Sequence, residues 1–339
     1  MHLSEFDFPF DPALVALQPA SPRDRAQLLL LNRVTQQRQH HHVADLPVLL
    51  KPGDLLVVND TKVMAARVPG IKKSTGTPVE VLFVKNLVGQ RWEIMVKGSF
   101  RVGQIIEFDQ QSYATIVKRD ATGTEVVMES PMPVTQFFDA RGVMPLPPYI
   151  KRVPTREDHQ WYQTMFAKHE GAIAAPTAGL HFTEALFRRL RNVAINVATV
   201  TLHVGPGTFK PVTTERIEDH QMGGEVFHVS PETADMINQT KRAGGRVVAV
   251  GTTVVRTLET VMKEKGEMVP LSGESRLFIT PGFEFRIVDG MMTNFHLPKT
   301  TLLMLVSAFA GIEPIRGAYE EAVKERYRFY SYGDAMLIL

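Results

Sequence analysis

Two stretches near the middle of the chain set its architecture; they read Gly171-Ala-Ile-Ala-Ala-Pro-Thr-Ala-Gly-Leu-His-Phe-Thr183 and Val197-Ala-Thr-Val-Thr-Leu-His-Val-Gly-Pro-Gly-Thr-Phe-Lys210. An apolar run lies at 172–175 in the first stretch, and another, at 193–204, extends into the second. Glycine, proline, threonine and histidine residues lie at or just after the end of each run. The segment between them has apolar residues at helical spacing, with Thr183 as a plausible N-cap. This order predicts a strand, a helix and a second strand.

The second of these strands, at 193–202, is apolar on almost both faces, which is typical of a buried parallel strand. In parallel α/β sheets, ligands bind just beyond the carboxyl ends of the strands. We therefore expect Thr177, His181, His203 and Thr208, which follow the two strands, to share one crevice.

Composition excludes several classes of chemistry. The 339 residues are 44% apolar and 22% charged, as in an ordinary soluble protein with room for two domains. The chain has no cysteine, so disulfides, thiolate nucleophiles, Cys-ligated zinc and iron–sulfur clusters are excluded. The net charge of +2 does not demand a nucleic-acid partner, and any polyanion site has to be a local patch.

The start of the chain is acidic and aromatic and lacks the pattern of a signal peptide. The longest apolar run, at 300–312, is too short to span a bilayer and predicts a buried helix. We expect a cytoplasmic protein with no membrane partner.

The pattern of apolar residues and turns changes between about Val63 and Ile150. Short alternating strands are separated by glycine turns in this range, with no helix between them, which predicts a small all-β barrel. Residues 1–62 and 151–339 read as repeated strand–helix units, with a helix expected to start at Ser230 and further strands at 246–250 and 283–288. The predicted fold is therefore an α/β-barrel-like large domain with the small barrel inserted into it.

Polar residues at the predicted strand ends are the candidates for chemistry. Asn59, Asp60 and Thr61 follow the apolar run 55–58, although an ordinary Asx turn explains them equally well. His181, His203 and His296 occupy similar positions in separate units. They could form a three-histidine zinc site, serve as structural hydrogen-bonders, or act in catalysis; no carboxylate spacing supports the zinc site.

Basic residues form scattered clusters, including Lys151 with Arg152, and Arg188, Arg189 and Arg191. Each cluster taken alone is typical of a solvated face. If these clusters line one groove, they would bind a phosphate backbone, and nearby aromatic residues would offer surfaces for base stacking; the aromatic candidates are Tyr149, Trp161, Tyr162, Tyr330 and Tyr332.

Several blocks of sequence together resemble the S-adenosylmethionine:tRNA ribosyltransferase-isomerase family. The blocks are Pro52-Gly-Asp-x-Leu-Val-Val-Asn-Asp-Thr-Lys-Val63, Asp158-x-x-Trp161-Tyr-Gln-Thr-x-Phe-Ala167, the stretch 171–183, Leu202-His-Val-Gly-x-Gly-Thr-Phe209, Gly251-Thr-Thr-x-x-Arg-x-Leu-Glu259, Thr293-Asn-Phe-His-Leu-Pro298 and Tyr332-Gly-Asp-Ala-Met336. One departure is clear: the family usually has His-x-Met-His-x-Glu where this chain has His220-Gln-Met-Gly-Gly-Glu225.

The resemblance implies an enzyme of queuosine biosynthesis that uses S-adenosylmethionine as a ribosyl donor. It would modify 7-aminomethyl-7-deazaguanine at the tRNA wobble position, form epoxyqueuosine, and release adenine and methionine. S-adenosylmethionine is then a consumed substrate, and no cofactor or metal is expected. We expect the chain to act as a monomer.

The same resemblance marks site residues. The candidates for acid and base are His181, His203, His296 and Asp334. The candidates for substrate binding are Asn59, Asp60, Thr61, Arg67, Thr177, Gly179, Gly205, Gly207, Thr208, Thr252, Thr253, Asn294, Tyr332 and Gly333. The candidates for RNA binding are Lys151, Arg152, Arg188, Arg189 and Arg191.

Two other classes of protein fit parts of the pattern. A non-catalytic tRNA-binding module would use the small barrel as its reader, but would not need the clustered polar strand ends. A metal-dependent hydrolase on an α/β barrel would bind zinc, which elemental analysis would detect.

Overall fold

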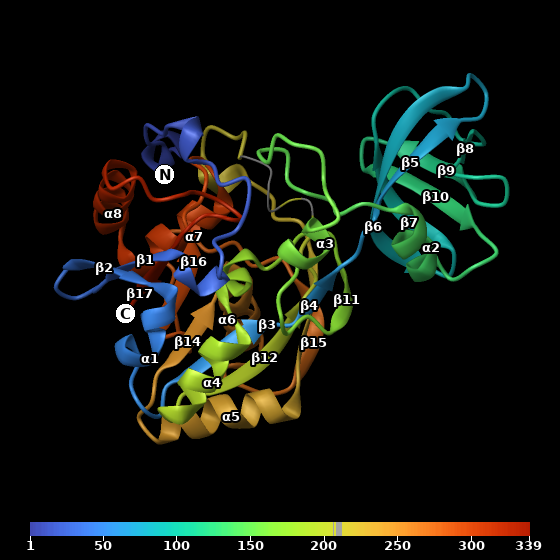
Figure 1. Ribbon diagram of the computed structural model, residues 1–339. Coiled ribbons are helices and arrows are strands. Elements are labelled where there is room, and N and C mark those ends of the chain that lie inside the picture. The colour runs from blue at the N-terminus through green and yellow to red at the C-terminus, as the bar shows by residue number, and fades with distance from the viewer. Residues whose placement is uncertain (206, 208–211) are drawn as a thin grey trace.

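The computed structural model describes residues 1–205, 207 and 212–339. It has two parts, a large α/β part that contains both termini and a smaller part beside it, which is mainly β-strands with one helix, α2 (Val134–Arg141) (Figure 1). The α/β class predicted for the large domain and the small β-barrel are both present.

The large part is built on a mixed nine-stranded sheet with edge strands β15 and β2. In spatial order, the strands are β15 (Leu271–Ser275), β13 (Glu225–Val229), β12 (Asn196–Leu202), β3 (Leu55–Asn59), β14 (Val247–Val250), β16 (Gly290–Asn294), β17 (Ala335–Ile338), β1 (Gln27–Leu31) and β2 (Arg38–His42). The neighbours β12, β3, β14 and β16 run parallel. Their carboxyl ends therefore meet at one edge of the sheet.

Strand β3 shows why the sheet is covered on both sides. Leu55 and Val57 point into one hydrophobic cluster, and Leu56 and Val58 point into another, as the period of two in a strand requires. The first cluster includes side chains of four helices, α5 (Pro231–Arg242), α6 (Thr252–Lys265), α7 (Thr301–Ala310) and α8 (Ile312–Lys324). The second includes side chains of α1 (Leu46–Leu49) and α4 (Glu184–Asn192).

The helix starts predicted at Thr183 and Ser230 are confirmed. The Thr183 hydroxyl accepts a hydrogen bond from the Leu186 N–H at 3.1 Å, and the Ser230 hydroxyl accepts one from the Thr233 N–H at 3.1 Å. Each cap satisfies an N–H group that has no partner inside the helix.

The small part is a closed barrel of six antiparallel strands. Around the barrel, the strands are β10 (Gly123–Glu129), β7 (Arg91–Val96), β6 (Thr77–Val88), β5 (Arg67–Lys72), β8 (Ile105–Glu107) and β9 (Tyr113–Asp120). Helix α2 (Val134–Arg141) contributes Phe137 and Phe138 to the core of the barrel. The domain limits 63 and 150 remain predictions, and the barrel strands lie between them.

A two-stranded parallel ladder lies where the chain leaves the large part and where it returns. It pairs β4 (Thr61–Val63), which follows β3, with β11 (His169–Ala172), which comes after the short helix α3 (Asp158–Trp161). Figure 1 shows this ladder between the sheet and the barrel. The ladder therefore holds the end of β3 next to the point where the barrel begins.

Two predictions of strands, at 172–175 and 283–288, differ from the structure. The predicted strand 172–175 is instead β11, which ends at Ala172, and 173–175 continue irregularly toward Pro176. Residues 283–288 form no strand because the buried Glu259 carboxylate accepts their backbone N–H groups, those of Arg286, Ile287 and Val288, at 3.0–3.2 Å. These donors are not free for a sheet, and the strand β16 starts at Gly290.

The apolar run at 300–312 forms α7 and the first residue of α8. In the described part of the chain no single helix is long and apolar enough to cross a membrane. Helices α7 and α8 meet that test of length and composition only as a pair, and the pair is bent by 114°.

Candidate active site

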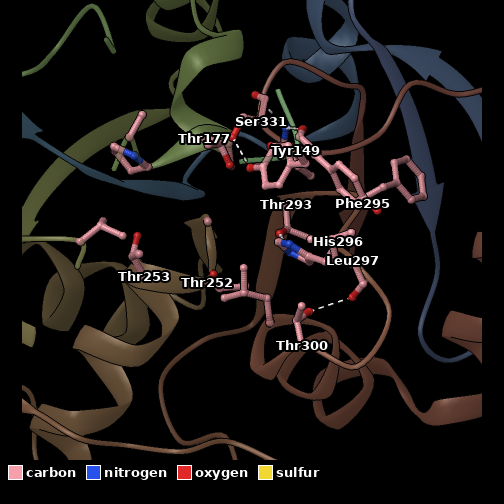
Figure 2. Close-up of a pocket in the computed structure, with 18 residues that line it drawn as sticks. Tyr149, Thr177, Thr252, Thr253, Thr293, Phe295, His296, Leu297, Thr300 and Ser331 are labelled. Atoms are coloured by element: carbon pink, nitrogen blue, oxygen red, sulfur yellow. Dashed lines mark hydrogen bonds between the residues drawn. The ribbon is translucent and has the colours of Figure 1, made fainter. Parts of the chain in front are cut away.

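A pocket lies at the edge of the sheet where the parallel strands end (Figure 2). Its volume is about 620 Å³, part of which is open to solvent. Many of its lining residues lie at the ends of β14 and β16 or at the starts of α6 and α7, and others belong to or precede η5, a 3-10 helix at Thr177–His181. The rest lie before α3, after β12 and before β17. The lining residues are Tyr149, Ala175, Pro176, Thr177, Ala178, Val204, Gly251, Thr252, Thr253, Thr293, Asn294, Phe295, His296, Leu297, Thr300, Leu302, Tyr330 and Ser331.

Five residues predicted from strand ends line this pocket: Thr177, Thr252, Thr253, Asn294 and His296. Figure 2 shows Thr252 and Thr253 on one side and Thr293, Phe295 and His296 on the other. None of the lining residues carries a formal charge at neutral pH, except where a histidine becomes protonated. The pocket therefore offers hydroxyl, amide and aromatic groups in a weakly polar setting.

His296 is held from two sides. Its Nε2 lies 2.7 Å from the Thr293 hydroxyl, and its backbone N–H donates to the Tyr319 hydroxyl at 2.8 Å. Burial lowers the pKa of His296 to about 3. The imidazole is therefore neutral at pH 7.

His181 does not line the pocket, but it contacts a residue that does. Its Nε2 lies 3.3 Å from Oδ1 of Asn294, whose Nδ2 donates to the Tyr330 carbonyl at 2.8 Å. Burial lowers the pKa of His181 to about 4. Tyr330 itself has a φ of 70°, an unfavourable backbone conformation that proteins retain most often at functional sites.

A second polar group, the β3-end cluster, lies beside the pocket and comprises Asn59, Asp60, Thr61, Thr201 and His203. The Nδ1 of His203 lies 2.8 Å from the Thr61 hydroxyl, and the Thr201 hydroxyl donates to Asp60 Oδ1 at 2.6 Å. Burial, followed by the nearby charge of His169, lowers the pKa of the half-buried His203.

Asn59 joins this cluster to both the sheet and the pocket. Its Oδ1 accepts from the Leu202 N–H at 3.1 Å, and its Nδ2 donates to the Leu202 carbonyl at 3.0 Å. The same Nδ2 lies 3.3 Å from Oγ1 of Thr253, which lines the pocket. The pocket and the β3-end cluster are therefore connected by a buried side chain.

The loop after His203 is anchored at Gly205. The Gly205 N–H donates to Glu225 Oε1 at 3.0 Å, and the other carboxylate oxygen forms a buried ion pair with Arg256. Gly207 is exposed, and Thr208 lies outside the described residues.

Three predicted residues near the end of the chain, Tyr332, Gly333 and Asp334, make packing or hydrogen-bond contacts within the fold and do not line the pocket. The buried Asp334 carboxylate accepts hydrogen bonds from the N–H groups of Arg328 and Gln27, at 2.7 and 3.0 Å. Tyr332 donates to Asp158 at 2.9 Å, and a Cβ at Gly333 would lie 2.5 Å from the Arg328 carbonyl oxygen. This geometry favours structural roles for all three.

Arg67 and Gly179 also lie away from the pocket lining. The Arg67 guanidinium, on the first barrel strand, donates to the Leu146 carbonyl at 3.0 Å. A Cβ at Gly179 would lie 2.8 Å from the Phe166 ring, so the glycine permits close packing of η5.

The predicted RNA-binding residues do not come together. Arg152 makes two hydrogen bonds to the buried Asp158, at 2.6 and 2.7 Å, whereas Lys151 is exposed. The exposed arginines of α4, Arg188, Arg189 and Arg191, lie on the helix that leads into the amino end of β12. The pocket is at the carboxyl end, so these arginines lie toward the opposite edge of the sheet from it.

The aromatic candidates for base stacking differ in burial and in whether they line the pocket. Tyr162 and Tyr332 are buried, so their rings are not open to a base. Tyr149 and Tyr330 line the pocket with their ring centroids 4.8 Å apart. Of these two, Tyr330 is almost fully buried and Tyr149 is partly exposed. Trp161 is also partly exposed, with the Arg152 guanidinium carbon 5.9 Å from its ring centroid.

Sequence reasoning did not assign Thr293, Thr300, Ser331 and His169 to the site. Thr293 stands next to Asn294 in a quoted family block, which is a signal that was available. Thr300 and Ser331 reach the pocket only through long-range packing, and no local pattern marks them. Among the described residues, no group of three or more histidine and acidic side chains could hold a metal ion.

Comparison with known proteins gives one consistent result. Two relatives, from Desulforamulus reducens and Staphylococcus aureus strain JH9, are 46% and 44% identical over the whole of both chains, and each is named S-adenosylmethionine:tRNA ribosyltransferase-isomerase. The crystal structure of S-adenosylmethionine tRNA ribosyltransferase from Thermotoga maritima is 36% identical, with a TM-score of 0.58, and the match covers 99% of this chain and 100% of that one. The model of the family described as queuosine biosynthesis protein matches residues 3–338, and the chain therefore belongs to this family.

Proposed function

We propose that this chain is an S-adenosylmethionine:tRNA ribosyltransferase-isomerase. It transfers the ribosyl group of S-adenosylmethionine to 7-aminomethyl-7-deazaguanine at the tRNA wobble position and isomerises it, giving epoxyqueuosine in the tRNA. Adenine and methionine are released. Full-length relatives with this name support the proposal.

The observation that carries the proposal is the uncharged pocket beside neutral imidazoles. Aromatic faces attract cations, so Tyr149, Phe295 and Tyr330 suit the positive sulfonium of S-adenosylmethionine and the flat adenine. The uncapped N-terminus of α6, at Thr252 and Thr253, suits a carboxylate such as that of the methionine part.

The chemistry needs a base and an acid. The sulfonium acidifies the adjacent ribose carbon, so a base that removes its proton leaves an ylide, with the electron pair of the broken C–H bond on carbon. The departing adenine needs a proton. His296 lines the pocket, and His203 lies in the cluster that Asn59 joins to it. Burial lowers the pKa of both imidazoles below the ordinary 6.5, so both are neutral at pH 7.

The tRNA must present its base outside the anticodon stack. Proteins read such bases by stacking and edge contacts, while phosphate contacts give salt-sensitive affinity. The partly exposed ring of Tyr149, which packs on Tyr330, offers a stacking surface, and exposed Lys151, two residues after Tyr149, offers a phosphate contact. We further propose that S-adenosylmethionine is consumed as a substrate with no cofactor, and that a monomer acts in the cytoplasm.

The test is product analysis with defined tRNA. Purified protein, S-adenosylmethionine and tRNA carrying the aminomethyl-deazaguanine base should give adenine and methionine in equal amounts. Unmodified tRNA is the control and should give neither. Release of S-adenosylhomocysteine would indicate methyl transfer and contradict the proposal, and tight tRNA binding without any product would favour a non-catalytic module.

A further inference from the structure

His169 lies beside the β3-end cluster. It is the first residue of β11 and the register partner of Thr61. Its imidazole is about half exposed, and its Nε2 lies 3.8 Å from Asp60 Oδ2. Asp60 is buried, with its other oxygen accepting from the Thr201 hydroxyl at 2.6 Å. The carboxylate thus presents one oxygen to His169 from a fixed position.

The two histidines at this place have partners of opposite kinds. His203 Nδ1 faces the Thr61 hydroxyl at 2.8 Å, which suits a neutral ring. His169 Nε2 faces the Asp60 carboxylate, a negatively charged partner, at 3.8 Å. Burial and the charge of His169 lower the pKa of His203, which agrees with this difference. Two titratable groups in such unlike environments are the usual arrangement of an acid and a base.

Other charged groups around the pair are already partnered. Lys62 on β4 and Glu170 on β11 bind each other at 2.8 Å, and Glu225 on β13 is paired with Arg256. The remaining neighbours are Lys168, which is exposed, and His228 on β13, whose Nδ1 lies 2.7 Å from the Ser272 hydroxyl. In the residues the structure describes, Asp60 is the one carboxylate within ion-pair distance of His169.

We propose that His169, held by Asp60, is the proton donor of the active site, and that His203 is the proton acceptor. The proposal rests on the ribosyl-transfer function given above. His203 Nε2 takes the proton from the ribose carbon beside the sulfonium. When the bond from the ribosyl carbon to adenine breaks, its electron pair leaves with adenine, and His169 supplies the proton that adenine gains.

The test is the pH dependence of adenine release in a single turnover at saturating substrates. The wild-type rate should rise with pH as His203 loses its proton and fall at higher pH as His169 loses its own. His169→Gln should remove the alkaline fall and slow the reaction at neutral pH by roughly 100-fold or more. Asp60→Asn keeps the shape of the side chain and should move the alkaline fall to lower pH.

His41→Gln is the matched control, because His41 lies on the far edge strand β2 and its ring Nε2 lies 3.3 Å from Gln39 Oε1, on the same strand. It should leave the profile unchanged. An alkaline fall that persists in His169→Gln would overturn the proposal. So would a rise in KM for tRNA with kcat unchanged, which would make His169 a phosphate contact.

A second measurement does not depend on turnover. Histidine side-chain NMR of the free protein should show His169 titrating above His203, and Asp60→Asn should lower the pKa of His169. If His203 titrates above His169 in the wild type, the proposal is overturned. Circular dichroism checks that Asp60→Asn is folded before its titration is compared with that of the wild type.

If the wild type releases no adenine at all, the ribosyl-transfer function fails, and the proton-donor role, which rests on it, fails with it. If the wild type is active, the pH profile and the titration decide the histidine roles alone.

Discussion

The imidazole of His203 lies against Gly171, in the space that a side chain would occupy. A Cβ built on Gly171 would lie 2.7 Å from His203 Nδ1, closer than real contacts allow, and the glycine has a φ of 146°. Gly171, on β11, therefore leaves the space that the ring of the proposed proton acceptor occupies.

Gly171→Ala should abolish most activity, because the new methyl group displaces the His203 ring from Thr61. We expect a fall in kcat of roughly 100-fold or more, similar to His203→Ala. Gly266→Ala is the control for backbone strain, since Gly266 has a φ of 76° but no atom within 4 Å of a built Cβ. Adenine release by a folded Gly171→Ala protein at the wild-type rate would refute the contact's importance.

His181 should make the fold sensitive to acid. Its pKa falls from 6.5 in the unfolded chain to about 4 in the fold, so the unfolded chain binds a proton first as the pH drops. Stability from this group is complete above pH ~6.5 and is lost progressively down to pH ~4. Between pH 7 and pH 5 this loss is about 2 kcal/mol.

His181→Gln removes the titrating ring while keeping an amide near Asn294. Denaturant unfolding at pH 7 and pH 5 should show a loss about 2 kcal/mol smaller in the variant than in the wild type. Equal losses in both proteins would mean that His181 is not buried as a neutral ring.

The salt dependence of tRNA binding should show which of the two basic clusters contacts the tRNA. Raising salt should weaken tRNA binding far more than S-adenosylmethionine binding, because phosphate contacts release counterions. Lys151→Ala should weaken tRNA binding and reduce the salt slope by about 1. The combined change of Arg188, Arg189 and Arg191 to alanine should have little effect, since α4 lies toward the other edge of the sheet. Fluorescence anisotropy with labelled tRNA measures both, and the reverse ranking would place the tRNA on α4.

Replacing Gly223 by the histidine that the family usually has there should leave the stability of the fold nearly unchanged. A Cβ on Gly223 meets no atom within 4 Å, so Gly223→His should change the unfolding free energy by less than about 0.5 kcal/mol. Gly224→Ala is the matched contrast, because its Cβ would lie 2.0 Å from the Glu274 carboxylate, which binds Lys85 of the barrel at 3.2 Å. Thermal unfolding of both variants checks this, and a destabilised Gly223→His would contradict it.

Activity should survive metal chelators, since the proposed chemistry uses only imidazoles for proton transfer. Purified protein treated with EDTA should release adenine at the untreated rate. Loss of activity that added zinc restores would favour the metal-dependent hydrolase instead.

Patterns of residues close together in the sequence were enough to predict which segments are helices and which are strands, and where many strands end. Period-two alternation and glycine turns marked the barrel strands, and Thr183 and Ser230 marked helix starts, because these signals depend on residues a few positions apart. The pocket-lining Asn294 and His296 lie in the block Thr293–Pro298 that carries the family resemblance, whereas the strand predicted before them, 283–288, is absent.

Tertiary structure alone decided which polar groups meet. His181 contacts Asn294 across 113 positions of sequence, and Glu259 removes the backbone donors of 286–288 that a strand needs. Asp334 and Arg152 look like free catalytic and RNA-binding groups in the sequence, yet each is bound to distant backbone, Asp334 to the Gln27 N–H and Arg152 to the Leu17 carbonyl. A hydrogen bond between residues far apart in the chain depends on how strands and loops pack, and no local period encodes it.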